Sequence, residues 1–108
     1  MFAKEKRLPL GKLYPHLKTH KLSFGIIKWG GNQLPHSRFA VLTTKKLDKR
    51  AVLRNKNRRV ITAILQALEP HIASGLDILI IPYTDISEVS HQDLYKELKE
   101  FFLTLRKA

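Results

Sequence analysis

Hydrophobic and polar positions along the chain repeat with the period of a strand in some stretches and of a helix in others. Aromatic and β-branched residues dominate 22–29 and 38–44, which is typical of strands. A glycine pair at 30–31 breaks the first stretch, so we expect the two strands to pair antiparallel across this loop. Residues 76–83 form a nearly continuous apolar run, typical of an interior strand covered on both faces, and Pro82 should mark its end.

Apolar residues three and four positions apart predict two amphipathic helices. The first is expected from about Arg50 to Leu68, and the second after Ser90, which stands as an N-cap with Asp93 three residues on. Their expected buried faces carry Ile61, Ile64, Leu65 and Leu68 in the first helix and Leu94, Leu98, Phe101, Phe102 and Leu105 in the second. The resulting order, β-β-α-β-α, predicts an α+β fold in which a small sheet is packed against helices in two layers.

Charge is spread unevenly over the 108 residues, whose net charge is +11. Residues 1–59 hold 16 cations and 2 acids, a balance of +14, whereas residues 60–108 hold 4 cations and 7 acids, a balance of −3. This asymmetry indicates a polyanion-binding footprint on the N-terminal half. The length suits a single domain, 1–108, in which the basic and proline-interrupted segment 1–21 is expected to be partly flexible.

The composition also indicates the cellular compartment of the protein. Cysteine is absent, which excludes disulfides and thiolate metal sites and favours a reducing compartment. No apolar run reaches the roughly 18 residues that a membrane span needs, and the first residues lack the apolar segment of a secretory signal. We therefore expect a cytoplasmic protein with no membrane partner and no obligate protein partner.

The stretch 45–59 holds eight cations against a single acid, Asp48, and leads directly into the first helix. Cations at a helix N-terminus oppose its dipole, so this cluster calls for an anionic partner. A guanidinium pairs two phosphate oxygens at once, which favours nucleic acid over a merely solvated helix face. The residues expected to make these contacts are Lys45, Lys46, Lys49, Arg50, Arg54, Asn55, Lys56, Arg58 and Arg59. In helical projection Arg54 lies near the edge of the apolar stripe, whereas Arg58 and Arg59 point well away from it.

The sequence from Thr43 to Arg59 resembles the signature of the protein subunit of bacterial ribonuclease P. That family shows a strand ending near Ser-Lys-Lys, a short crossover, and Ala-Val-x-Arg-Asn-Arg-x-Lys-Arg opening a long helix. The matching residues are Lys45, Lys46, Ala51, Val52, Arg54, Asn55 and Arg59, and the resemblance spans about residues 22–105. Arg58 stands where a Lys is common, and three further positions depart from the pattern. Lys56 replaces the second Arg and loses its bidentate fork, Thr44 replaces the usual Ser, and Thr62 stands where a further Arg often follows.

The resemblance implies an α+β sandwich of the ribosomal protein S5 domain 2-like class, with a left-handed β-α-β crossover against the usual right-handed rule. It implies that the basic helix binds a large catalytic RNA while a cleft on the sheet holds the 5′ leader of precursor tRNA. The RNA, using Mg²⁺, would then hydrolyse the phosphodiester bond. The expected cleft residues are Tyr14, Phe24, Ile26 and Phe39, with core packing as the alternative for the last three. Trp29, at a strand end, is expected to be the exposed aromatic.

A catalytic site in the protein itself is not predicted. The acids are sparse, and His16 and His20, although four residues apart, have no evident third ligand for a metal. Asp77 is either a buried, satisfied strand residue or a contact at the sheet edge. The alternatives to a ribonuclease P subunit are a generic structured-RNA-binding or ribosomal-type protein and a DNA-binding helix module.

Overall fold

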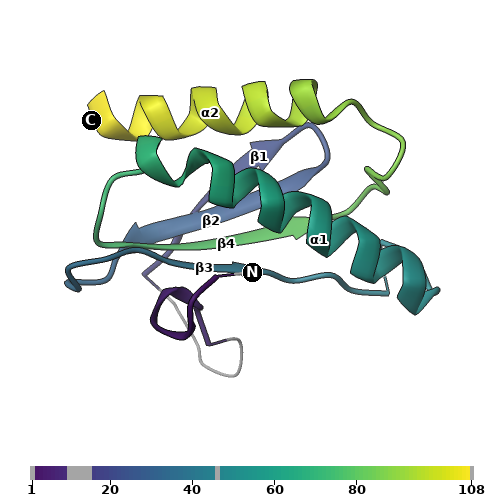
Figure 1. Ribbon diagram of the computed structural model, residues 1–108, viewed down its shortest axis with the longest axis horizontal. Coiled ribbons are helices and arrows are strands. Elements are labelled where there is room, and N and C mark those ends of the chain that lie inside the picture. The colour runs from purple at the N-terminus through teal and green to yellow at the C-terminus, as the bar shows by residue number, and fades with distance from the viewer. Residues whose placement is uncertain (1, 10–15, 46, 108) are drawn as a thin grey trace.

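The protein folds into a four-stranded sheet with two helices on one face (Figure 1). The structure is a computed structural model that describes residues 2–9, 16–45 and 47–107. The strands are β1 (Lys18–Leu22), β2 (Gly25–Gly31), β3 (Arg38–Val41) and β4 (Leu76–Pro82). The helices are α1 (Ala51–Leu68) and α2 (His91–Lys107), with 3-10 turns η1 (Lys4–Lys6) and η2 (Glu69–His71). The predicted α+β two-layer architecture is confirmed, as are both helices.

The strands lie in the order β1-β2-β4-β3, which differs from the predicted pairing. β2 pairs antiparallel with β1 and with β4, while β3 pairs parallel with β4. The expected pairing of 22–29 with 38–44 is therefore wrong, because β4 lies between these two segments. β1 was not predicted at all. It is an edge strand whose residues Lys18 to Lys21 are all exposed, so no apolar alternation marks it in the sequence.

The connection from β3 through α1 to β4 joins two parallel neighbours in the sheet. In Figure 1 both strands run from left to right, β4 lies above β3, and α1 passes in front of the sheet, so this crossover is left-handed. The handedness that the resemblance implied is thus observed. It places the basic N-terminal end of α1 beside the C-terminal ends of β3 and β4.

The core lies between the sheet and the helices. The stripes predicted for both helices are buried there except for Leu105, which is half-buried. Ile61, Leu65, Leu68, Leu98 and Phe102 are fully inaccessible to solvent. Along β4 the burial alternates: Ile78 and Ile80 face the helices and are fully buried, whereas Leu79 and Ile81 on the other face are only half-buried. The apolar run 76–83 is therefore an interior strand, as predicted, but the helices cover one of its faces only. Pro82 ends it, also as predicted.

Close packing of β2 on β4 makes one glycine a sensitive position. A Cβ on Gly25 would collide with the carbonyl oxygen of Ile81 and lie 2.7 Å from the Cα of Pro82, both of them backbone atoms. We therefore expect Gly25→Ala to destabilise the protein by about 1–3 kcal/mol, because the strands must move apart. A thermal melt should show a fall of several degrees.

Gly31→Ala is the matched control, since nothing lies within 4 Å of the Cβ it would add on the same strand. The packing argument is wrong if both substitutions change the melting temperature equally.

Candidate nucleic-acid interface

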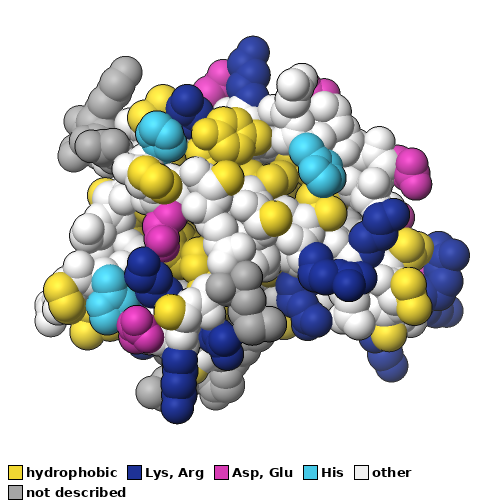
Figure 2. All heavy atoms as spheres, in the orientation of Figure 1, with side chains coloured by type: hydrophobic (Ala, Val, Ile, Leu, Met, Phe, Trp, Pro, Cys, Tyr) yellow, Lys and Arg dark blue, Asp and Glu magenta, His cyan; other side chains and the backbone are white. Residues whose placement is uncertain are grey.

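The basic stretch forms the connection after β3 and the first turns of α1. Six of the nine predicted contacts are exposed cations: Lys45, Lys49, Arg50, Lys56, Arg58 and Arg59. Asn55 is also exposed, Arg54 is half-buried, and Lys46 lies outside the described residues. Figure 2 shows Lys and Arg side chains gathered over the N-terminal half of α1. The structure thus brings six of the predicted cations together on one surface.

The N-terminus of α1 is not neutralised by its own sequence. Its first turn holds no acid, and the N-cap residue Arg50 makes no side-chain cap hydrogen bond. Asp48, two residues before Arg50, accepts hydrogen bonds from the Arg50 guanidinium at 3.1 Å and from its backbone N–H at 2.8 Å. These bonds hold the pKa of Asp48 at about 2, so the carboxylate stays charged and offsets Arg50. The helix dipole and the remaining cations therefore add to one positive field.

Arg54 is turned inward. Its Nη1 donates to the backbone oxygens of Asp48 at 2.9 Å and Lys49 at 2.8 Å, which ties the crossover connection to the first turn of α1. Arg58, one turn further along the helix, donates to Asn55 Oδ1 on the exposed surface, at 3.1 Å. Arg54 and Arg58 therefore differ in what they do within the fold. Arg54 shapes the surface that Arg58 presents.

Asn57 fixes where the basic end of α1 lies, and the sequence analysis missed it. Its side chain is fully buried. Its Nδ2 donates to Leu53 O and to Asp85 Oδ1, each at 2.8 Å, and its Oδ1 accepts the Ile86 N–H at 2.7 Å. The hydrogen bond from Asn57, followed by those from Ser87, holds the pKa of Asp85 below its usual range. The available signal was a polar residue one turn before Ile61, in line with the apolar stripe.

Replacing Asn57 with Ala should cost about 2 kcal/mol of stability, because Asp85 and the Ile86 N–H lose their partner. Asn55→Ala is the control: it removes the same side chain from an exposed position on the same helix and should change stability by less than about 0.5 kcal/mol. Urea unfolding measures both. Equal effects would show that Asn57 does not anchor the helix.

A second surface lies on the sheet face away from the helices, here called the open face. Side chains alternate along a strand, so the register assigns residues to it. Three rows cross the strands: Lys21, Ile26 and Ile81; then Thr19, Lys28, Leu79 and Ala40; then Gly30, Asp77 and Arg38. Apolar side chains lie in the middle of this face and cations beside them. His16 and Leu17 cross it at Gly30, where an added Cβ would lie 3.1 Å and 3.0 Å from them.

The four residues predicted to line a cleft are not brought together. Ile26 is half-buried on the open face, but Phe24 and Phe39 are 4% and 3% exposed within the core on the helix side. Tyr14 lies outside the described residues. Core packing, the alternative reading, is what the structure shows for the two phenylalanines. Trp29 is half-buried rather than exposed, because its ring packs edge-on against Phe101 at 6.3 Å.

At one end of the open face, Asp77 is 1% exposed and paired. Its carboxylate accepts two hydrogen bonds from Arg38, both at 2.8 Å, and one from Asn32 Nδ2 at 3.0 Å. Burial alone would raise the pKa of Asp77, but the bonds from Arg38 and Asn32 outweigh it and the pKa lies below its usual value. Asp77 is therefore the buried, satisfied residue of the two readings, and it ties β4 to the β2–β3 loop.

Arg38→Met should cost about 3 kcal/mol at pH 7, because it leaves a buried carboxylate unpaired. The folded-state pKa of Asp77 is lowered, so its contribution is present above the unfolded pKa, about 3.9, and is lost as the pH falls below that value. The stability difference between Arg38→Met and the parent should therefore shrink at pH 3. Urea titrations at both pH values test this, and a difference independent of pH contradicts it.

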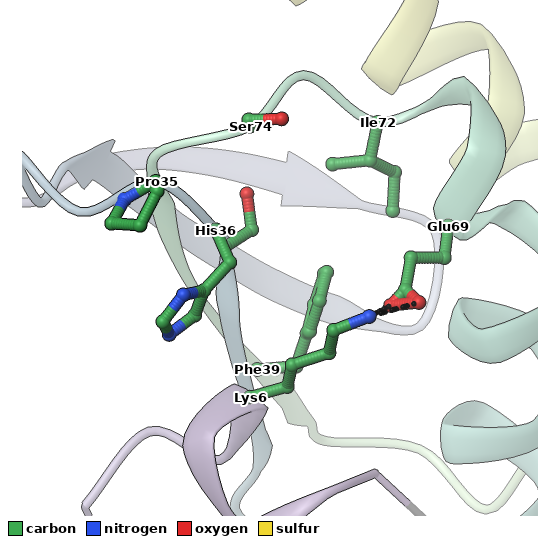
Figure 3. Close-up of a pocket in the computed structure, with 8 residues that line it drawn as sticks. Lys6, Pro35, His36, Phe39, Glu69, Ile72 and Ser74 are labelled. Atoms are coloured by element: carbon green, nitrogen blue, oxygen red, sulfur yellow. Dashed lines mark hydrogen bonds and ion pairs between the residues drawn. The ribbon is translucent and has the colours of Figure 1, made fainter.

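The described residues contain a further small pocket and two histidines, His16 and His20, and neither feature forms a ligand or metal site. A pocket of about 120 Å³ is lined by Lys6 and Glu69, which form an ion pair at 3.0 Å (Figure 3). This volume is below that of ordinary ligand sites. His20 packs on Phe101 on the helix side and His16 lies on the open face, so the two do not converge. Within 2–9, 16–45 and 47–107, no group of three His, Asp or Glu could hold a metal ion, and no helix could cross a membrane.

Comparison with known proteins decides the family. The family model described as "Ribonuclease P" matches residues 11–106. The chain belongs to the ribonuclease P protein family. Ribonuclease P processes the 5′ leader of precursor tRNA, and the chain is a protein component of this enzyme.

Curated ribonuclease P protein components include similar chains. That of Synechocystis sp. is 30% identical over 91 residues, covering 83% of this chain and 73% of its own. That of Bacillus mycoides is 32% identical over 79 residues, covering 73% and 68%. Among solved structures, the ribonuclease P protein of Thermotoga maritima superposes with a TM-score of 0.79 at 23% identity, covering 91% of this chain and 96% of its own. This last likeness independently supports the fold.

Proposed function

We propose that the chain assists a catalytic RNA in endonucleolytic removal of the 5′ leader from precursor tRNA, and that its basic surface holds that RNA. The contacts are assigned to Lys45, Lys46, Lys49, Arg50, Asn55, Lys56, Arg58 and Arg59, with Arg54 shaping the connection behind them. No further protein subunit is required. The relatives are bacterial, and bacterial precursor tRNA is made in the cytoplasm, so the proposal places the complex there.

The observation that carries the proposal is the placement of exposed cations on the unneutralised N-terminus of α1. Lys56, Arg58 and Arg59 are exposed, and no acid lies in the first turn to compete for them. Arg54 and Asn57 form hydrogen bonds within the fold that hold this surface in place. A rigid cationic surface binds a structured polyanion at less entropic cost than a mobile one.

The open face is assigned to the leader. Ile26, Leu79 and Ile81 offer an apolar floor for unpaired bases, and Lys21 and Lys28 lie beside it for phosphates. The Asp77 carboxylate does not repel the RNA leader, because Arg38 neutralises the charge of this carboxylate. The open face lies on the side of the sheet away from the helices, whereas the basic surface lies on α1. One protein can therefore contact two RNAs at once.

Bond cleavage is assigned to the RNA and its Mg²⁺ ions. Three carboxylates are already engaged within the fold: Asp48 with Arg50, Asp77 with Arg38, and Asp85 with Asn57. The role left to the protein is to bind, to orient the RNA and to screen phosphate repulsion. Screening by a cationic protein lowers the Mg²⁺ concentration that the RNA needs.

The deciding measurement is precursor-tRNA cleavage by a bacterial ribonuclease P RNA at low Mg²⁺, with and without the protein. We expect enhanced cleavage at the mature 5′ end, lost in the double variant Arg58→Ala/Arg59→Ala. RNA affinity should fall roughly tenfold or more, and the log–log salt slope should shrink by about 1.5, as two phosphate contacts are removed.

The matched control is Lys96→Ala/Lys99→Ala, which removes two cations from α2, away from the basic surface. It should leave cleavage and the salt slope nearly unchanged. Tight, salt-sensitive RNA binding without any cleavage enhancement would instead leave a general structured-RNA-binding protein. If both double variants lose RNA affinity equally, binding depends on net charge alone.

A further inference from the structure

The turn between β1 and β2 lies beneath α2 and has no role in the functions described so far (Figure 1). Ser23 and Phe24 form it, because Leu22 and Gly25 are the last paired residues of the two strands. Two-residue hairpin turns favour conformations with positive φ, since these match the twist of the flanking strands. Among the described residues other than glycine, Gln33 alone has a positive φ. The turn is therefore of a type that tends to splay its two strands apart.

Contacts from outside the hairpin hold this turn. On one side, the Glu97 carboxylate on α2 accepts hydrogen bonds from the Ser23 N–H at 2.7 Å and from the Ser23 hydroxyl at 2.6 Å. On the other side, the carbonyl oxygen of Phe24 accepts the N–H groups of Tyr83 at 2.8 Å and Thr84 at 3.2 Å. The two bonds between Glu97 and Ser23 are here called the turn clamp.

The strand β1 has little else to fix its orientation. It lies at the edge of the sheet, and the side chains of residues 18–21 are exposed, so apolar burial contributes little to holding it. A groove of about 490 Å³ lies between β1 and α2. Contacts across this groove include His20 on Phe101, with ring centroids 4.7 Å apart, and the turn clamp. Hydrogen bonds to a carboxylate are short and directional, so the turn clamp fixes an orientation that a ring contact leaves free.

Lys21 is the functional residue beside the turn clamp. It precedes Ser23 by two residues and lies on the open face in one row with Ile26 and Ile81. A tilt of β1 about the turn would move the Lys21 ammonium away from this apolar floor. The basic surface would stay in place, because Asn57 anchors α1 independently of β1.

We propose that Glu97 is a positioning residue for the 5′ leader. Through the turn clamp it sets the orientation of β1, and thereby the place at which Lys21 meets a leader phosphate. Glu97 acts through Lys21 and contacts no RNA itself. The inference rests on the proposed function and deepens it, because it makes leader binding depend on a residue of α2, outside both RNA-binding surfaces.

The test is Glu97→Gln, which keeps the size of the side chain but puts an amide N–H where Ser23 needs an acceptor. The complex of this variant with a bacterial ribonuclease P RNA should bind leader-bearing precursor tRNA about fivefold more weakly than the parent complex. Its affinity for mature tRNA should stay at the parent value. The affinity of the variant for the ribonuclease P RNA and the salt slope should also be unchanged, which reports that the protein is folded and α1 intact.

Glu100→Gln is the matched control, since it removes the same charge from an exposed position three residues further along α2. Loss of an acid by itself leaves RNA affinity unchanged or raises it, so electrostatics alone predicts no weakening in either variant. A weaker precursor complex with Glu97→Gln but not with Glu100→Gln therefore supports the turn clamp. Ser23→Ala is a second variant, and it should weaken precursor binding by a smaller factor because the backbone bond to Glu97 remains.

A double-mutant cycle tests the route through Lys21. Because Glu97 acts through this lysine, the variant Lys21→Ala/Glu97→Gln should lose no more precursor affinity than Lys21→Ala alone. Additive losses overturn the proposal. Parent-like precursor affinity in Glu97→Gln overturns it as well, and so does an equal loss of affinity for mature tRNA.

Failure of this proposal is distinguishable from failure of the proposed function. If Lys21→Ala weakens precursor binding and Glu97→Gln does not, the turn clamp proposal fails and the proposed function stands. If the parent complex binds precursor and mature tRNA equally well, the assignment of the leader to the open face fails, and the turn clamp proposal fails with it.

Discussion

The buried side chain of Asn57 is the constraint on which the functional surface depends. A helix whose first turns carry many cations and no acid is electrostatically unfavourable at its own N-terminus. Packing and hydrogen bonding must compensate, and Asn57 supplies three bonds at 2.7–2.8 Å, two of them to the connection that follows β4. Arg54 does the same for the connection that precedes the helix. The charges that repel one another are therefore held in place by neutral and inward-facing groups.

A division of labour follows among residues that look alike in the sequence. Asp48 neutralises Arg50, and Arg54 donates hydrogen bonds to backbone oxygens. Arg58 and Arg59 remain exposed. Arg38, far from this stretch, neutralises a buried acid at the open face. Counting cations predicts a polyanion partner, whereas their hydrogen-bond partners show which of them are already engaged within the fold.

The sequence predicted the local features of this fold well and the non-local ones poorly. Both helices and their buried stripes follow from a period that neighbouring residues impose, so α1 and α2 were found nearly to the residue. β1 escaped notice because an exposed edge strand needs no apolar alternation. The pairing of β2 was misassigned, since the insertion of β4 depends on contacts some fifty residues apart. Asn57 escaped for the same reason, its partner Asp85 being 28 residues away.

The strand order also bears on how the chain acquires its shape during synthesis. β2 and β3 are consecutive in the sequence but never touch as neighbours, because β4 occupies the position between them. Before β4 emerges, β3 has no partner for its ladder and α1 has no completed sheet to pack on. Such long-range pairing slows folding and makes it wait for the last third of the chain. A nascent fragment that already contains the whole basic helix therefore cannot yet hold it in the geometry of the folded protein.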